Sequence, residues 1–361
     1  MRDRVSGELR EINMSTMDIA RFDDEEPSLR TKVHFLRQTA VYPEPTQHVD
    51  TIETHMSWVF LTDRFAYKLK KPVRLPFLDF STVERRRHFC FEEIRLNQRL
   101  APRIYIGVVP LIAERDGALS LGGTGGAVDW LVKMHRVSID RMLDHAIRHD
   151  RLRDQDLHAL ADCLIDFYRA APAIDLTPRE YRQRFESAVR ENWEVLRQAR
   201  DILPESRVAD IHRRQLAFID ASPWLLEERA AARRIVEAHG DLRPEHVMLG
   251  ADPQIIDCLE FHTPFRVLDP LDELTFLGME CELLGAVQIG SLVLGRYCRA
   301  LEDDPAPQLL DFYGCYRASV KLKLAYWHLV DPSVRDTARW PPIARRYLEF
   351  AERRKRGLST S

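Results

Sequence analysis

The chain has 361 residues, of which 45% are hydrophobic and 30% are charged, as expected for a globular protein of roughly two domains or one two-lobed unit. Its 53 basic and 56 acidic residues give a formal net charge of -3, which does not indicate a nucleic acid or an anionic membrane as partner. No apolar run reaches the roughly 18 residues of a membrane span, and the charged N-terminus lacks the apolar core of a secretion signal. The six cysteines include no Cys-x-x-Cys pair, so we expect free thiols in a cytoplasmic protein.

The N-terminal part is predicted to contain a tail, a short helix and a pair of strands. Residues 1–27 end in an acidic run and a proline, which cannot bury enough apolar surface to fold alone, so we expect a disordered tail. Residues 29–37 have the pattern of a short helix. Residues 56–61 and 65–70 are strands by residue type and alternation, and the short turn between them indicates a hairpin.

A longer helix and two more strands follow. Residues 83–100 carry many charges and an apolar stripe at helical spacing. Two further strands are predicted at 108–113 and 128–134. The glycine-rich segment 122–126 between them is predicted to be a plain hairpin turn.

The rest of the chain has the pattern of amphipathic helices, for example over residues 179–203. A loop and strand region at 239–261 interrupts them. The sequence therefore predicts an α+β protein with a disordered tail (1–27), a small β-rich lobe (28–134) and a larger helical lobe (135–361).

The most informative stretch is His239-Gly240-Asp241-Leu242-Arg243-Pro244-Glu245-His246, followed by Ile255-Ile256-Asp257. It places one carboxylate, Asp241, in a short loop and a second, Asp257, at the end of an apolar strand. This arrangement is typical of phosphoryl transfer, in which one acid holds a hydroxyl nucleophile and the other holds the metal on the nucleotide. We expect Asp241 to accept or orient the hydroxyl proton and Asp257 to bind Mg²⁺. His239 is expected to hold the loop by hydrogen bonds, with direct acid–base catalysis as the alternative.

A lysine and a glutamate nearer the N-terminus extend the predicted site. Alternation along residues 65–70 places Lys68 and Lys70 on one face, and the alanine two positions before Lys68 leaves room for a nucleotide base. Lys68 is therefore the predicted phosphate contact and Lys70 the second choice; a solvated strand face is the alternative. Glu93 lies on the apolar stripe of the next helix and needs a partner, for which Lys68 is the candidate. The adjacent Glu92 is expected at the surface, and a surface position for Glu93 is the alternative.

These motifs resemble the aminoglycoside phosphotransferase family, which belongs to the protein-kinase-like fold. The residues that carry the resemblance are 239–247 and 255–261, and segments 53–61, 66–72 and 77–82 are similar to one uncharacterised bacterial branch. The resemblance covers roughly residues 30–350. It implies a bilobal fold with ATP or GTP between the lobes and a small-molecule hydroxyl as the acceptor.

The resemblance also implies a role for individual residues. Lys68 would contact the nucleotide phosphates and Glu93 would pair with it. Asp241 would be the catalytic aspartate and Asp257 the metal aspartate. Met134 would lie near the adenine-binding hinge.

Two departures from the family pattern affect these expectations. His246 stands where the family has a metal-binding Asn. Mg²⁺ prefers oxygen ligands, so we expect His246 to bind metal poorly, to favour Mn²⁺, or to contact phosphate when protonated. No glycine-rich phosphate loop precedes Trp58. Thr54 and Ser57 are the candidate hydrogen-bond donors there, and a plain β-turn is the alternative.

The sequence therefore predicts an ATP-dependent phosphotransferase that uses Mg²⁺ or Mn²⁺ and acts on a small-molecule hydroxyl. GTP is the alternative nucleotide. No nucleic acid or membrane partner is expected, and neither the acceptor nor the oligomeric state can be derived. The competing hypothesis is a catalytically weak or inactive nucleotide-binding module, a pseudokinase, which His246 and the missing glycine-rich loop favour.

Overall fold

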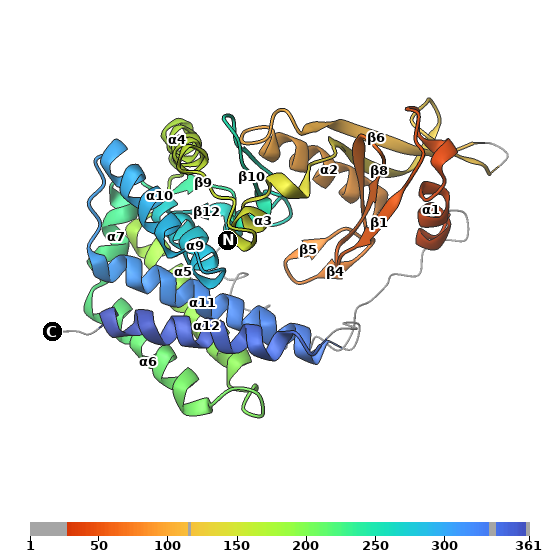
Figure 1. The fold of residues 1–361 in the computed structure, drawn as a ribbon. Coiled ribbons are helices and arrows are strands. Elements are labelled where there is room, and N and C mark those ends of the chain that lie inside the picture. Colours follow the sequence, from red (N-terminus) through yellow and green to blue (C-terminus); the bar gives the residue numbers. More distant parts are fainter. Residues whose placement is uncertain (1–26, 115–116, 332–336, 359–361) are drawn as a thin grey trace. The chain divides into compact units, whose positions relative to one another are not determined.

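The computed structural model describes residues 27–114, 117–331 and 337–358, and the chain divides into two compact units (Figure 1). Unit 1 consists of Met1–Ser138 together with Leu259–His262, and unit 2 consists of Ile139–Cys258 and Thr263–Ser361. The predicted lobe boundary after residue 134 lies shortly before Ser138, where the first segment of unit 1 ends. Residues 259–262 were predicted to belong to the helical lobe, whereas they belong to unit 1. The predicted tail lies outside the described residues, apart from Pro27.

Unit 1 is built on a six-stranded antiparallel sheet in the order β1-β2-β3-β8-β6-β7. The strands of this sheet are β1 (Asp50–Glu53), β2 (Ser57–Leu61), β3 (Phe65–Lys70), β6 (Tyr105–Ala113), β7 (Leu119–Leu121) and β8 (Gly126–His135). The remaining elements are α1 (Leu29–Leu36), η1 (Thr39–Val41), the ribbon of β4 (Arg74–Leu75) and β5 (Leu78–Asp79), and α2 (Val83–Asn97). Strand β7 was not predicted. The glycine-rich turn joins β7 to β8, which are not neighbours in the sheet, so it is not the predicted hairpin turn.

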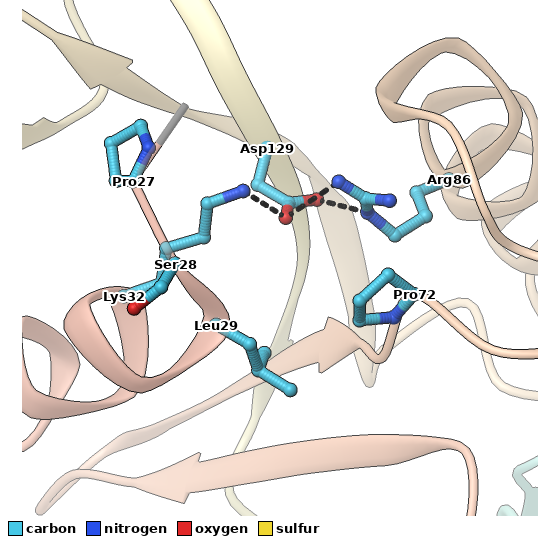
Figure 2. Close-up of a pocket in the computed structure, with 7 residues that line it drawn as sticks. All are labelled: Pro27, Ser28, Leu29, Lys32, Pro72, Arg86 and Asp129. Atoms are coloured by element: carbon cyan, nitrogen blue, oxygen red, sulfur yellow. Dashed lines mark hydrogen bonds and ion pairs between the residues drawn. The ribbon is translucent and has the colours of Figure 1, made fainter. Parts of the chain in front are cut away.

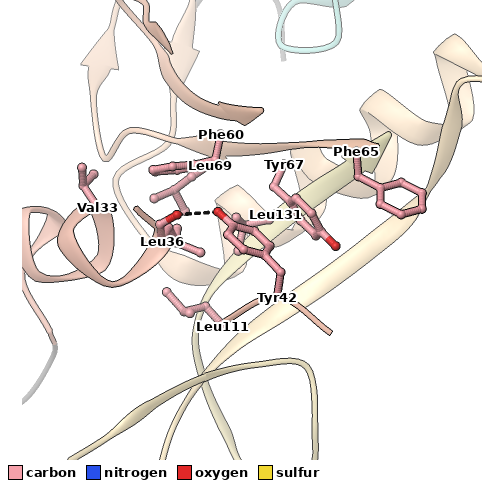
Figure 3. Close-up of a cluster of buried hydrophobic side chains, with 9 residues drawn as sticks. All are labelled: Val33, Leu36, Tyr42, Phe60, Phe65, Tyr67, Leu69, Leu111 and Leu131. Carbon is pink, nitrogen blue, oxygen red and sulfur yellow. Dashed lines mark hydrogen bonds between the residues drawn. The ribbon is translucent and has the colours of Figure 1, made fainter. Parts of the chain in front are cut away.

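The two faces of β3 have different environments because its side chains alternate. Phe65, Tyr67 and Leu69 lie in an apolar cluster that also contains Val33 and Leu36 of α1 (Figure 3). The opposite face of β3 carries lysines that bond to α2. Helices α1 and α2 therefore cover opposite faces of this strand. Lys68 and Lys70 share the face toward α2, as the alternation of residues 65–70 predicted.

Unit 2 is mostly helical. Its helices are η2 (Ile139–Arg141), α3 (Leu143–Arg148), α4 (Asp154–Ala170), α5 (Pro178–Leu196), α6 (Glu205–Ala221), α7 (Pro223–Ala231), η3 (Pro244–His246), α8 (Thr263–Arg266), α9 (Pro270–Leu283), α10 (Val287–Ala300), α11 (Pro307–Val330), α12 (Trp340–Arg354) and η4 (Lys355–Leu358). Two short ribbons pair β9 (Val236–Glu237) with β12 (Val267–Leu268) and β10 (Val247–Met248) with β11 (Gln254–Ile255). The helix predicted over residues 179–203 ends at Leu196, and the buried apolar residues Ala199 and Leu203 lie outside it.

Helix α9 is the most buried helix of unit 2 and positions the site described below. It packs closely on α10, where a Cβ added to Gly290 would lie 2.8 Å from the Cα atom of Gly278. Its N-cap Asp269 accepts the backbone N–H of Leu271 and is ion-paired with the buried Arg229. None of the described helices has the length and apolarity needed to cross a membrane.

Candidate active site

The His-Gly-Asp loop of unit 2 is held by one buried glutamate of α9. Glu273 is 1% exposed, and its carboxylate accepts the backbone N–H of His239 at 3.1 Å and that of Gly240 at 2.6 Å. The hydroxyl of Tyr168 donates to the same carboxylate at 2.6 Å. Gly240 has a φ of 92°, a left-handed conformation that favours glycine. Glu273 was not predicted as a site residue, although its carboxylate fixes the backbone of this loop.

His239 is fully buried, and both of its ring nitrogens have backbone partners. Nε2 donates to the carbonyl oxygen of Ile256 at 2.9 Å, and Nδ1 accepts the N–H of Asp241 at 3.3 Å. Burial lowers the pKa of His239, so the ring is neutral and one tautomer satisfies both bonds. Both ring nitrogens thus bond to backbone groups, as expected if His239 holds the loop.

Asp241 has an ionised carboxylate that is one-third exposed. Nε of Arg243 donates to its Oδ2 at 3.0 Å. Burial alone would raise the pKa of this carboxyl, but the cations Arg243 and Lys321 lower it below its ordinary value. An ionised carboxylate in this position can accept a hydrogen bond from an alcohol.

His246 lies between the two aspartates of the motif. Its Nδ1 donates to the carbonyl oxygen of Asp241 at 2.9 Å, and its Nε2 accepts from Nη2 of Arg243 at 3.1 Å. These two bonds define one neutral tautomer. Nε2 is 3.6 Å from Oδ2 of Asp257, whereas Nδ1 is 3.9 Å from Oδ2 of Asp241. The imidazole therefore has both predicted acidic residues as neighbours.

Asp257 lies two residues after the end of β11 in the β10–β11 ribbon. The N–H of Ile256 donates to the carbonyl oxygen of His246 at 2.9 Å, which joins the two motifs through their backbones. Asp257 has a φ of 62°, a region that non-glycine residues adopt rarely and that is often found at functional sites. Its side chain is 48% exposed. A partly exposed carboxylate thus projects from a backbone fixed by neighbouring strands.

The donor atoms around Asp257 are compatible with a divalent cation that is bound partly by phosphate and water. A carboxylate oxygen is the ligand type that Mg²⁺ prefers, and one or two carboxylates commonly suffice when phosphates supply the rest. The described residues include no group of three or more His, Cys, Asp or Glu arranged around a metal site. A metal ion bound through Nε2 of His246 would have to displace Arg243 from that nitrogen.

Four charged side chains form a cluster in unit 1, on the α2 face of β3. Glu93 is fully buried and accepts Nζ of Lys68 at 3.0 Å on Oε1 and Nζ of Lys70 at 2.5 Å on Oε2. Lys70 is also fully buried and donates to Glu260. Lys68 is 15% exposed. The structure thus contains the expected Lys68–Glu93 pair, with a second lysine and a second glutamate beside it.

The environment of Lys70 differs from that of the adjacent surface residues. Burial alone would lower the pKa of Lys70, but the carboxylates of Glu260 and Glu93 raise it above its ordinary value. In contrast, Glu92 bonds to the exposed Arg95 on the outer side of α2, as expected. Lys70 was predicted only as the second choice for the phosphate contact.

Met134 and Ser57, the other predicted nucleotide contacts, also lie in unit 1. Met134 is 9% exposed on β8 and is paired with Ala66 of β3. Ser57 is 3% exposed at the start of β2. The Oγ1 atom of Thr54 accepts the N–H of Ser57 at 3.0 Å and donates to its carbonyl oxygen at 3.1 Å, so these residues close a tight hairpin turn. The eight predicted site residues therefore fall into two groups of four, one in each unit.

Comparison of the whole chain with solved structures identifies the fold. The chain matches choline kinase from Cryptosporidium parvum Iowa II at a TM-score of 0.55 and 11% identity, covering 90% of this chain and 95% of that one. It matches a choline/ethanolamine kinase family protein from Mesorhizobium loti at 0.53 and 12%, covering 91% and 98%. It matches the GDP complex of a mutant aminoglycoside 2'-phosphotransferase-IIIa at 0.52 and 16%, covering 89% and 97%. The chain has the protein-kinase-like fold of the aminoglycoside phosphotransferases. The predicted α+β, protein-kinase-like fold is confirmed.

Sequence comparison adds relatives but no activity. The chain is 30% identical over 285 residues to the uncharacterised protein Rv2004c of Mycobacterium tuberculosis and, equally, to the uncharacterised protein Mb2027c of Mycobacterium bovis. The match covers 76% of this chain and 54% of each relative, so the chain spans about half the length of the curated relatives it matches. No protein-family profile matches the sequence.

Proposed function

We propose that this chain is an ATP-dependent phosphotransferase that moves the γ-phosphoryl group to a hydroxyl of a small molecule. The observation that carries this proposal is the state of Asp241, an ionised, partly exposed carboxylate in a loop fixed by Glu273. The fold supports it, because the structural neighbours are kinases or phosphotransferases by name and one was solved with GDP.

In this proposal Asp241 accepts a hydrogen bond from the acceptor hydroxyl and orients it for in-line attack. Arg243 lowers the pKa of this carboxyl and bonds to both Asp241 and His246, which restrains the two side chains. Glu273 holds the loop backbone, so the carboxylate does not have to reorganise when the acceptor binds.

The nucleotide would be held by residues of both motif groups. Lys68, kept in place by Glu93, would contact the phosphate oxygens, with Met134 near the base and Ser57 near the phosphates. Asp257 would bind Mg²⁺ or Mn²⁺ through its partly exposed carboxylate. When bound, that ion neutralises charge on the phosphate oxygens.

A phosphoryl-transfer assay with matched variants tests the proposal. ATP and GTP, each with Mg²⁺ or Mn²⁺, would be incubated with a panel of small alcohols and amino sugars, and both nucleotide diphosphate and phosphorylated product would be measured. Asp241→Asn is expected to reduce turnover roughly 10²–10⁴-fold, the range for a lost general base, while nucleotide binding persists. Asp252→Asn, an exposed carboxylate in the nearby β10–β11 turn, is the control and should leave turnover unchanged. Wild-type turnover in Asp241→Asn would refute the assignment.

The second candidate is a nucleotide-binding module without turnover. It is favoured by His246, whose Nε2 is already bonded to Arg243 at the position where the family has a metal-binding Asn. Thermal unfolding with ATP, GTP, Mg²⁺ and Mn²⁺ separates the two candidates. A nucleotide-dependent rise in Tm without product from any acceptor would support the module, and turnover that depends on Asp241 would exclude it.

A further inference from the structure

A small cavity in unit 1 is bordered by three buried charged side chains from three different elements (Figure 2). Lys32 of α1 is 4% exposed, Arg86 of α2 is 2% exposed and Asp129 of β8 is 1% exposed. The amine and the guanidinium approach the Asp129 carboxylate from opposite sides (Figure 2). The cavity has a volume of about 50 Å³, which is three to five times the roughly 10–15 Å³ that one water molecule requires.

The Asp129 carboxylate is already saturated with donors. Its Oδ1 accepts Nε of Arg86 at 2.8 Å and the N–H of Trp130 at 3.0 Å. Its Oδ2 accepts Nζ of Lys32 at 2.9 Å and Nη2 of Arg86 at 3.0 Å. A carboxylate offers about four acceptor positions, so Asp129 cannot accept a further bond from either cation.

Each cation keeps one N–H that no described residue accepts. Lys32 has three N–H donors, and the described chain accounts for two, to Asp129 and to the carbonyl oxygen of Val128. Arg86 has five, of which four go to Asp129 and to the carbonyl oxygens of Phe80 and Ser81. A buried N–H of a charged side chain that has no acceptor lowers the stability of the fold.

The charges around the cavity do not balance. Two buried cations face one carboxylate, and no other acidic residue of the described chain lines the cavity. The first turn of α1, capped by Ser28, borders the same space and adds the positive end of a helix dipole. A buried surplus charge is unfavourable unless it is paired.

We propose that this cavity binds a small oxyanion, the phosphate or carboxylate group, which accepts the remaining N–H of Lys32 and of Arg86. The bound anion brings the buried charges to balance. This site is separate from the proposed catalytic residues and does not depend on them. The anion has two possible sources, a molecule from solution or the acidic residues 23–26, which directly precede Pro27 in the sequence.

Thermal unfolding of the full chain in sodium phosphate tests the proposal, with sodium chloride added to hold the ionic strength constant. If the anion comes from solution, the wild-type Tm rises with phosphate and saturates. Lys32→Met leaves Arg86 and Asp129 as a balanced pair, so the variant should fold and should bind phosphate roughly 10- to 100-fold more weakly, the loss for a hydrogen bond to a charged group. Arg85→Met is the control, because this neighbouring residue is exposed and pairs with Asp79 instead. Asp129→Asn removes the carboxylate that lies between the two cations and should make the Tm more dependent on phosphate than it is in the wild type.

A variant with Asp23→Asn, Asp24→Asn, Glu25→Gln and Glu26→Gln distinguishes the two sources. If the wild type does not respond to phosphate but this variant does, the oxyanion site is supported and its occupant is the acidic run of the chain. If neither responds, the proposal is overturned. It is also overturned if Lys32→Met responds to phosphate as strongly as Arg85→Met, because the effect is then that of an adventitious ion only.

Discussion

Replacing Lys70 by Met tests the charge cluster of unit 1 directly. The substitution keeps most of the side-chain volume but removes the cation that bonds to both Glu93 and Glu260. Lys70 and Glu93 are fully buried and Glu260 is 7% exposed. Removing one partner of a buried ion pair costs about 3–5 kcal/mol, because the opposite charge stays buried without it. We therefore expect Lys70→Met to lower the free energy of unfolding by about that amount.

Urea unfolding of matched variants measures this cost. Lys71→Met is the control, since Lys71 is the next lysine in the chain and pairs with the half-exposed Glu53, an interaction worth about 0–1 kcal/mol. The double variant Lys70→Met with Glu260→Gln removes one charge of each sign and leaves Lys68 paired with Glu93. The two substitutions should couple by roughly 0.5–3 kcal/mol, with Glu260→Gln less harmful in the Lys70→Met background. Equal losses in Lys70→Met and Lys71→Met, or simple additivity in the double variant, would refute the reasoning.

Four other outcomes can be measured. Glu273→Gln places an amide N–H₂ against the loop backbone, so turnover should fall and amide exchange at the loop should accelerate, and unchanged exchange would contradict the role of Glu273. Arg243→Met removes a cation that lowers the pKa of Asp241. Because the ionised Asp241 is the active form, the acidic limb of the pH profile of kcat/KM should move to higher pH, and an unmoved limb would argue against this effect. His246→Asn should keep or raise activity with Mg²⁺, because an amide oxygen suits this ion better than imidazole, and a large loss of turnover would count against the idea. Gly290→Ala puts a Cβ 2.8 Å from the Cα of Gly278, so it should destabilise the chain by about 1–3 kcal/mol, and an unchanged Tm would contradict the close crossing of α9 and α10.

Features that depend on local sequence were predictable. The alternation over residues 65–70 predicted both the strand and the face that carries its lysines, because the two-residue period is imposed by the backbone itself. The motif at 239–246 similarly predicted a loop held by His239. In contrast, β7 has three residues and was missed, since so short a strand has too few positions to establish a pattern.

Glu273 shows why the support of a loop is harder to predict than the loop. In the sequence it is one of several acids at the start of a helix, a position where a carboxylate usually serves the helix itself. Of these acids, Asp269 caps the helix, and Asp272 pairs with Arg317. Only the packing of α9 against the loop gives Glu273 the two backbone N–H groups of His239 and Gly240. Each acid has the same local sequence context, so the tertiary contact alone distinguishes their roles.

A tertiary contact also distinguishes Lys68 from Lys70. Both lie on one face of β3 and both bond to Glu93, so neither the strand nor α2 separates them. The difference comes from Glu260, which is 190 residues away from Lys70 in the sequence and bonds to it. Two buried carboxylates beside each other require a cation between them, and Lys70, fully buried, is committed to that position. Lys68 keeps the more exposed amine, and for that reason it, and not Lys70, is the lysine that we expect to reach a phosphate.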